Sequence, residues 1–310
     1  MKALNTSVVV MRNEITLLLR ERTLYVLLGI FFVMAVLSTI IGWSTQHTIM
    51  NVYDAAVAEL ALVGQDAPPF PVNSTPLGIM TNMIIYNVLI GSLLAIVLGY
   101  FVGIHDRMYG VVKILFSRPI RSRDIFLGKI FATVLILSLV TLMAFLVSVI
   151  SLGIFGVLGT SAVVSVLLFY GVSLLYMSGF AFLAMSFAFV FQNSTSAMLY
   201  ALFIWMIVTF ALPELSSALF PTSSLNPILP PSNFLNSPVL SFAHTVTYPF
   251  SVSEHYKALC ATILGVGAGA TNTGSIWFNT SVVMLWSALA FILSLRFFTN
   301  MDPSSDTLYE

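Results

Sequence analysis

The stretch HDRMYGVVKILFSRPIRSRDIFLGK, which runs from His105 to Lys129, decides how the rest of the chain is arranged. It holds six of the twelve Lys and Arg residues in a 310-residue chain that is only 8% charged. Apolar runs long enough to cross a bilayer lie on both sides of it. Basic loops next to membrane spans are retained in the cytoplasm. The stretch therefore predicts a cytoplasmic loop between two membrane-spanning helices.

A short amphipathic helix is predicted at the start of this loop, over residues 106–116. Its apolar positions follow a helical spacing, and they are Met108, Val111, Val112, Leu115 and Phe116. Pro119 disfavours helical dihedral angles in the residue before it, so we expect the helix to stop at Arg118. After Ile120, basic residues lead into the next apolar run.

The composition excludes most soluble classes of protein. The chain is 58% apolar, and a soluble domain would carry about 25% charged residues. The net charge is zero, which argues against nucleic acid as a partner. The single Cys260 excludes an intrachain disulfide and a cysteine-based metal cluster.

Six apolar runs approach or exceed the ~20 residues that a spanning helix needs. They cover residues 24–43, 82–104, 130–155, 162–191, 195–212 and 277–298. None contains an Asp, Glu, Lys or Arg except the last, where Arg296 lies near the end and can reach the interface. A charge at a helix centre costs about 2.5 to 3.5 kcal/mol on insertion. The sequence therefore predicts an all-α integral membrane protein, with residues 1–310 forming one domain of six transmembrane helices.

The basic residues also predict the orientation of these spans. With six spans, eleven Lys and Arg residues fall on one side of the membrane and only Lys257 on the other. An odd number of spans would worsen this split. We therefore expect both termini and the central loop, residues 105–129, to be cytoplasmic.

Three further segments complete the layout. Residues 1–23 are too short and too charged to span, and they predict an interfacial elbow helix with Met11, Ile15, Leu18 and Leu19 on one face. Its charged flanking residues include Arg12, Glu14, Arg20 and Arg22. Residues 44–81 and 213–276 are expected outside the cytoplasm. The first has room for a short helix at 54–63. The second has room for one at 254–264, either in the interface or dipping into the membrane without crossing it.

The central loop resembles the segment between the second and third spans of type-2 ABC transporter permeases. That family's pattern is approximately acidic-Arg-x-x-Gly-Thr-Leu, then Leu-Ser-x-Pro-Ile-x-Arg, then Leu-Gly-Lys. Asp106 takes the usual Glu place, and Val111 and Val112 replace Thr-Leu. The matching positions are Gly110, Ser117, Pro119, Ile120, Arg123, Gly128 and Lys129. The N-terminal NEITLLLRERT is similar to the family's elbow helix. The outward segment after span one is similar to the branch that contains the nitrous-oxide-reductase maturation permease.

The resemblance implies a transporter permease subunit of the cell membrane, not an enzyme, that moves or extracts a substrate, with export expected. Two such chains, identical or paralogous, would pair, and each would receive a separate cytoplasmic ABC ATPase. The sequence contains no G-x-x-x-x-G-K-[ST] phosphate-binding motif. ATP and Mg²⁺ are therefore expected on the ATPase, and this chain is expected to hold no catalytic residue, cofactor or metal.

The resemblance also implies roles for individual residues of the loop. The residues expected to couple to the ATPase are Asp106, Arg107, Met108, Gly110, Val111, Lys113, Leu115, Phe116, Arg118 and Pro119. The apolar ones would pack into a cleft of the partner, and the charged ones would form a rim that fixes the register. Arg121, Arg123 and Lys129 are expected at the membrane surface, where they meet anionic lipid.

Two alternatives remain open from the sequence. An ion-coupled secondary transporter usually needs a buried carboxylate or a broken helix, and neither is evident in the apolar runs. A structural membrane subunit that transmits force to an extracytoplasmic partner would have the same composition. A search for an ATPase that co-purifies with the chain would separate these alternatives from a permease.

Overall fold

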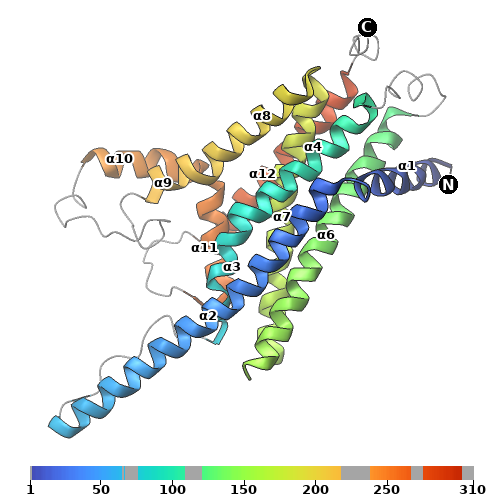
Figure 1. Cartoon of the computed structure of the whole chain (residues 1–310). Helices are drawn as coiled ribbons and strands as arrows, with labels where there is room; N and C mark the ends of the chain where they lie inside the picture. Colours follow the sequence, from blue (N-terminus) through green and yellow to red (C-terminus); the bar gives the residue numbers. More distant parts are fainter. Residues whose placement is uncertain are drawn as a thin grey trace.

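The computed structural model describes residues 2–64, 66, 76–108, 121–217, 238–266 and 275–301. These residues form helices and no strand (Figure 1). Six helical segments are long and apolar enough to cross a bilayer, and they are Arg22–Val63, Leu77–Asp106, Ser122–Ile154, Thr160–Val190, Ser194–Ser216 and Ile276–Thr299. Helices satisfy their own backbone hydrogen bonds, which hydrocarbon cannot do for them. The prediction of an all-α membrane protein with six spans is confirmed.

The centre of the bundle is formed by α4 (Ser92–Met108) and α7 (Thr160–Val190). In their most apolar stretches, 72% of the span that contains α4 and 67% of α7 are buried, against 22% of the span that begins with α8 (Ser194–Met206). Small residues let the two central helices approach closely. A Cβ added at Gly99 would collide with the backbone carbonyl of Ala181. The outer helices α6 (Ser122–Ile154) and α12 (Ile276–Thr299) pack against α7.

The first helix, α1 (Lys2–Leu18), lies across one end of the bundle, where α4 and α12 also end (Figure 1). We call this end the α1 end. After a short turn the chain enters α2 (Arg22–Val63), a single helix of 42 residues. The predicted span covered only residues 24–43, followed by a separate short helix. The structure differs because the helix continues unbroken through the polar residues after Gly42 and ends at Gly64 in a left-handed conformation.

Two spans contain a π-helical turn. The second span runs through η1 (Pro76–Met80), α3 (Thr81–Tyr86), the π turn η2 (Asn87–Gly91) and then α4. The fifth runs through α8, the π turn η3 (Ile207–Ala211) and α9 (Leu212–Ser217). Spans four and five are separated by a short break at which Asn193 caps α8, accepting a hydrogen bond from Thr195 N at 2.9 Å.

The chain after span five forms α10 (Pro238–Thr247), η4 (Tyr248–Phe250) and α11 (Val252–Leu264). The sequence allowed a helix at 254–264, and α11 covers it. Its 13 residues are too few to cross a bilayer. It packs against α3, α7 and α12 instead. We call this region, far from α1, the α11 end.

Neutral polar groups hold α11 in place, and we call them the α11 layer: Asn87, Ser173, Tyr176, Ser253 and Tyr256. The Tyr256 hydroxyl is 2.7 Å from Ser173 Oγ and accepts from Asn87 Nδ2 at 3.3 Å. Tyr176 and Ser253 hydroxyls are 2.9 Å apart. Ser253 Oγ donates to the carbonyl of Val208 at 3.0 Å, inside the π turn η3. Both π turns therefore take part in seating α11.

Candidate functional site

One face of α1 is buried against the bundle, and it contains a charged residue. Ser7, Glu14 and Leu18 are the buried side chains of α1, and their spacing places them on one face of the helix. The predicted face was partly right, because Leu18 is buried whereas Leu19 is 51% exposed. Glu14, expected at the flank, is only 1% exposed.

Gly128 on α6 lets α1 approach closely enough to bury Glu14. A Cβ added at Gly128 would lie 2.6 Å from Val10 Cβ and 2.8 Å from the Ser7 carbonyl oxygen. Contacts this short are forbidden, so any other residue would push α1 away. The next residue along α6 is Lys129. Gly128 thus determines whether Lys129 and Glu14 can meet.

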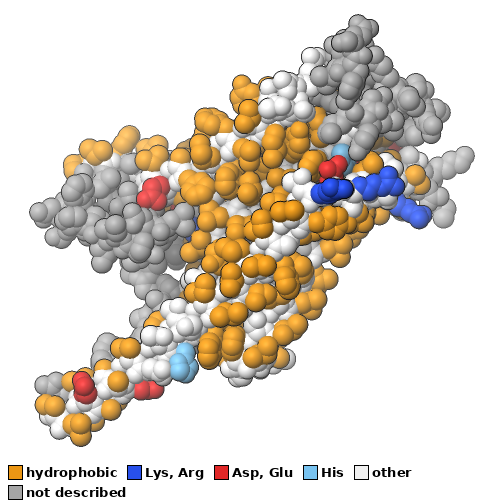
Figure 2. Space-filling model, in the orientation of Figure 1, with side chains coloured by type: hydrophobic (Ala, Val, Ile, Leu, Met, Phe, Trp, Pro, Cys, Tyr) orange, Lys and Arg blue, Asp and Glu red, His pale blue; other side chains and the backbone are white. Residues whose placement is uncertain are grey.

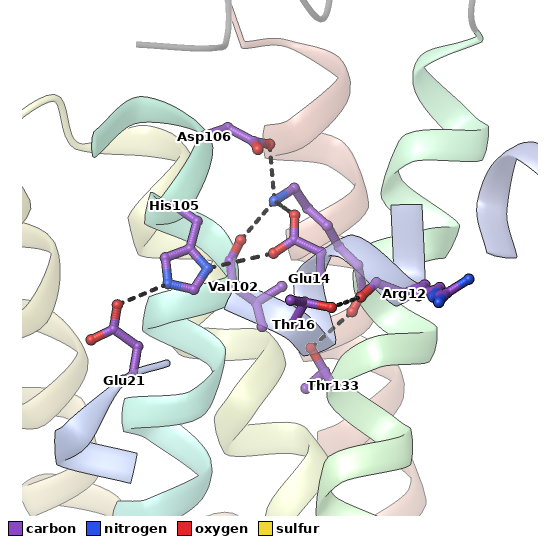
Figure 3. Close-up of polar contacts among 9 residues, drawn as sticks. Arg12, Glu14, Thr16, Glu21, Val102, His105, Asp106 and Thr133 are labelled. Carbon is purple, nitrogen blue, oxygen red and sulfur yellow. Dashed lines mark hydrogen bonds and ion pairs between the residues drawn. The ribbon is translucent and has the colours of Figure 1, made fainter. Parts of the chain in front are cut away.

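The Lys129 ammonium lies at the centre of a buried ionic cluster (Figure 3). Its Nζ is 2.6 Å from Glu14 Oε1 and 2.9 Å from Asp106 Oδ2, and it donates to the Val102 carbonyl at 2.8 Å. An ammonium has three N–H donors, and each finds an acceptor here. A buried charge is tolerated only when it is paired and hydrogen-bonded in this way. Of the Lys and Arg side chains that the structure describes, Lys129 alone is buried.

His105 extends the cluster toward the turn between α1 and α2. The ring is fully buried, with Nδ1 3.6 Å from Glu14 Oε2 and Nε2 3.5 Å from Glu21 Oε1. We define the ionic cluster as Glu14, Glu21, His105, Asp106 and Lys129. It joins α1, the last turn of α4 and the second turn of α6.

The electrostatics of the cluster favour an ionised Glu14. Burial alone would raise the pKa of the Glu14 carboxyl, but the Lys129 ammonium and His105 more than offset it, so its pKa lies below the ordinary value. The site between Glu14 and Asp106 that a bound cation would occupy is filled by Lys129 Nζ. The arrangement therefore acts as a brace, because removing one partner would strand an opposite charge in a buried place.

The position of the ionic cluster determines which helices it connects. Asp106 lies at the start of the central loop and Lys129 at its end, so their ion pair fastens the two ends of the loop to each other. Glu14 fastens α1 to the same point. A force applied to the loop would reach three helices together rather than one.

The structure places the predicted site residues in three groups. Arg12, Arg20, Arg22, Arg121 and Arg123 are exposed. Two residues have surroundings that the sequence did not indicate. Lys129, expected at the membrane surface, is 1% exposed, and the Asp106 carboxylate faces Lys129 of its own chain. The approach of α1 at Gly128 covers Lys129 with Glu14, and Asp106 reaches the same ammonium from the last turn of α4.

The predicted coupling helix lies mostly outside the described residues. The backbone of α4 extends through Arg107 to Met108. The remaining coupling residues are outside the described ranges, and they are Gly110, Val111, Lys113, Leu115, Phe116, Arg118 and Pro119. Their predicted role in binding an ATPase therefore stays a prediction.

Sequence reasoning missed His105 and the pairing of Glu14 with Lys129. One signal was present, because Glu14 falls on the stripe that also carries Met11 and Leu18. A carboxylate on the apolar face of an amphipathic helix needs a buried partner. The partner was hard to find because Lys129 lies 115 residues away along the chain.

Comparison with known proteins identifies a family model that matches most of the chain. Residues 8–303 match a family model described as ABC-2 family transporter protein. This match covers α1 from Val8 onward, all six spans and the ionic cluster. The search of curated proteins finds no match. The likeness to the nitrous-oxide-reductase maturation branch is not confirmed by the family match and stays a prediction.

Proposed function

The chain belongs to the ABC-2 family of transporter proteins, and we propose that it is the membrane subunit of an ATP-driven exporter. Two permease chains would pair, and each would bind a separate cytoplasmic ATPase that holds ATP and Mg²⁺. The observation that carries the proposal is the ionic cluster, which ties both ends of the central loop to the elbow helix. A loop that transmits movement from one subunit to another needs both of its ends held rigidly in this way.

The proposed mechanism follows from the rigid connection that the ionic cluster makes at the ends of the central loop. Residues 106–118 would form the coupling helix, with its apolar residues in a cleft of the ATPase and its charged residues at the rim. Closure of the two ATPases on ATP would push this helix. Because Asp106, Lys129 and Glu14 are fastened together, α1, α4 and α6 would move as one body. The movement would open or close the interface between the two permeases.

The surface of the bundle offers a place for the second permease. Figure 2 shows hydrophobic side chains covering the face formed by α2, α4 and α8, with Lys and Arg side chains confined to the area of α1. Exposed apolar residues on α2 and α8 include Ile30, Val33, Leu37, Leu199 and Phe203. Lipid and a second chain are both compatible with such a surface. The substrate path would run along the permease interface, lined by spans one, two and five.

The membrane orientation is part of the proposal. Eleven of twelve basic residues fall on the side that contains α1 and the central loop. The positive-inside rule places that side in the cytoplasm of a cell membrane. The far part of α2 and α11 would then face away from the cytoplasm.

Co-purification from the native host tests the proposal. An affinity-tagged chain should bring down an ABC ATPase in equal amount, and ATP turnover should depend on the permease. Gly110→Trp should lower the permease-stimulated turnover roughly fivefold or more, in the range of typical coupling energies. Leu139→Ala, on the exposed face of α6, should leave turnover unchanged and serves as the control.

Two results would contradict the proposal. One is a purified, active complex without an ATPase. The other is transport that stops when an ion gradient is collapsed and continues without ATP, which is the behaviour of a secondary transporter.

A further inference from the structure

A groove opens between the first turns of α6 and the last turns of α12, at the α1 end of the bundle. Its cavity volume is about 540 Å³, and its walls include Arg123, Phe126, Leu127, Phe291, Leu295 and Arg296. It is separate from the ionic cluster, whose Lys129 and Glu14 side chains are buried inside the bundle. Two arginines and an apolar lining are the features that need an explanation.

The floor of the groove is rigid. The Phe126 ring packs on Phe291 and Phe298 with centroid separations of 5.7 Å and 5.5 Å, and both Phe126 and Phe298 are about 1% exposed. These rings hold the two helices at a fixed separation. Arg123 lies one turn before Phe126 and Arg296 two residues before Phe298. The two guanidinium groups are thus mounted on a packed aromatic base, one from each helix.

The charge of the groove is not neutralised by the described part of the chain. Arg123 and Arg296 are both exposed, and among the described residues neither forms an ion pair. Asp124 follows Arg123 but does not line the groove. Arginine presents planar donors that match the oxygens of a phosphate group. The open end of the groove therefore suits a singly charged phosphodiester.

The other end of the groove continues into surfaces that suit an acyl chain. On α6, Leu127 is followed at helical spacing by Phe131 and Leu135, which are 48% and 42% exposed. On α12, Ile292 is preceded by Leu289 and Leu285, which are 50% and 58% exposed. The two stripes flank the groove and run along spans three and six. A ligand that fits both parts has an anionic head and an apolar tail.

We propose that this groove binds an anionic phospholipid. Its phosphate lies between Arg123 and Arg296, and an acyl chain lies along Leu127 and Ile292 toward the membrane interior. Basic pockets between transmembrane helices bind anionic headgroups in this way. The proposal depends on the membrane location of the chain and does not depend on its role as an exporter.

Native mass spectrometry of the full chain in detergent tests the proposal. Phosphatidylglycerol and phosphatidylcholine of the same acyl composition would be titrated separately. We expect phosphatidylglycerol to bind more tightly. The double variant Arg123→Gln/Arg296→Gln should weaken its binding roughly 10- to 30-fold, because each arginine contributes several-fold. The control Arg12→Gln/Arg20→Gln removes two exposed basic residues at the same end and should leave binding within about twofold.

Three results would overturn the proposal. Equal affinity for the two lipids would show that the arginines do not select an anion. Equal weakening by the control variant would show a diffuse effect of charge. Soluble glycerol phosphate that binds as well as the lipid would show that no acyl chain is held.

The sequence after Met301 contains Asp302, Asp306 and Glu310. A further experiment tests whether this acidic segment, rather than a lipid, occupies the groove. A chain shortened at Met301 should bind phosphatidylglycerol as the full chain does. Lipid binding that appears only after shortening would assign the groove to that acidic segment instead, and would overturn the proposal.

Discussion

The two ends of the bundle hold their buried polar groups in different ways. At the α1 end, the Lys129 ammonium of α6 pairs with Glu14 of α1 and Asp106 of α4, and His105 links Glu14 to Glu21 in the turn before α2. At the α11 end, hydroxyl and amide groups of η2, α7 and α11 pair in a neutral layer. Breaking a buried ion pair costs about 3–5 kcal/mol, whereas one neutral hydrogen bond contributes about 1 kcal/mol. The α1 end therefore depends on a few costly contacts, and the α11 end on several small ones that can exchange partners.

The largest effect should come from Lys129→Met. The substitution keeps the apolar stem but leaves Glu14 and Asp106 facing each other without the ammonium. We expect a loss of about 3–5 kcal/mol, which is a fall in Tm in detergent of roughly 5–10 °C. Differential scanning fluorimetry measures it.

Two variants sharpen that prediction. Arg123→Met, an exposed residue on the same helix, should change the Tm by about 1 °C or less. The double variant Glu14→Gln/Lys129→Met should recover much of the loss, since removing both partners avoids a stranded charge. Equal Tm values for Lys129→Met and Arg123→Met would show that the ionic cluster does not brace the fold.

The second effect concerns the closeness of α1 and α6. Gly128→Ala places a Cβ against Val10 and Ser7, and we expect overpacking to cost about 1–3 kcal/mol. The same substitution at Gly171 on α7 meets no atom within 4 Å. It should leave stability unchanged or raise it by about 0.5–1 kcal/mol. If both alanine variants have the same Tm, close packing of α1 is not what positions Glu14.

A smaller effect is expected at the α11 end. Tyr256→Phe removes the hydroxyl that meets Ser173 and Asn87, but these two remain 3.0 Å apart and still pair. The expected cost is about 1 kcal/mol, or about 2 °C in Tm. Tyr200→Phe, at a half-exposed ring, is the matched control and should change nothing measurable. A loss as large as that of Lys129→Met would remove the distinction between the two ends.

The smallest expected effect concerns pH. Two buried carboxylates should contribute to stability with opposite dependence on pH. The pKa of Glu14 is held below its ordinary value of 4.5, so its charge stabilises the fold above pH 4.5 and this contribution is lost as the pH falls further. Burial raises the pKa of Glu254 on α11, which the nearby Lys257 offsets only in part. The folded state therefore favours the protonated Glu254 carboxyl. This group contributes to stability at low pH, and the contribution is lost as the pH rises through the raised pKa.

Thermal melts of Glu14→Gln and Glu254→Gln between pH 4 and 8 measure these contributions. Relative to the unmodified chain, Glu14→Gln should be less stable at pH 7, with a gap that narrows below pH 4.5. Glu254→Gln should gain relative stability as the pH rises. If the Tm differences of the two variants change with pH in the same direction, the opposite pKa shifts of Glu14 and Glu254 would be contradicted.

The sequence predicts the number and placement of the spans because charge is so costly in hydrocarbon. Residues 24–43 show where α2 is apolar, but hydropathy cannot show where a helix ends once it has left the bilayer. The π turn at Asn87 was equally out of reach, since the Asn87 side chain bonds Tyr256 of α11, which lies 169 residues away along the chain. In the site, the Leu-Gly-Lys pattern indicated a loop end. Its physical reason, which is the approach of α1 at Gly128 and the ion pair of Lys129, needed the three-dimensional arrangement.

The length of α2 has a consequence for motion. Its 42 residues span about 63 Å at 1.5 Å per residue, roughly twice the thickness of the hydrocarbon core. With the apolar residues 24–43 in the hydrocarbon, about 30 Å of unbroken helix would extend beyond it. If span one tilts by roughly 10° about the membrane surface, simple geometry moves the far tip by about 5 Å. Small rotations among the buried helices would thus produce larger displacements at the tip of α2, to which a molecule bound outside the membrane could respond.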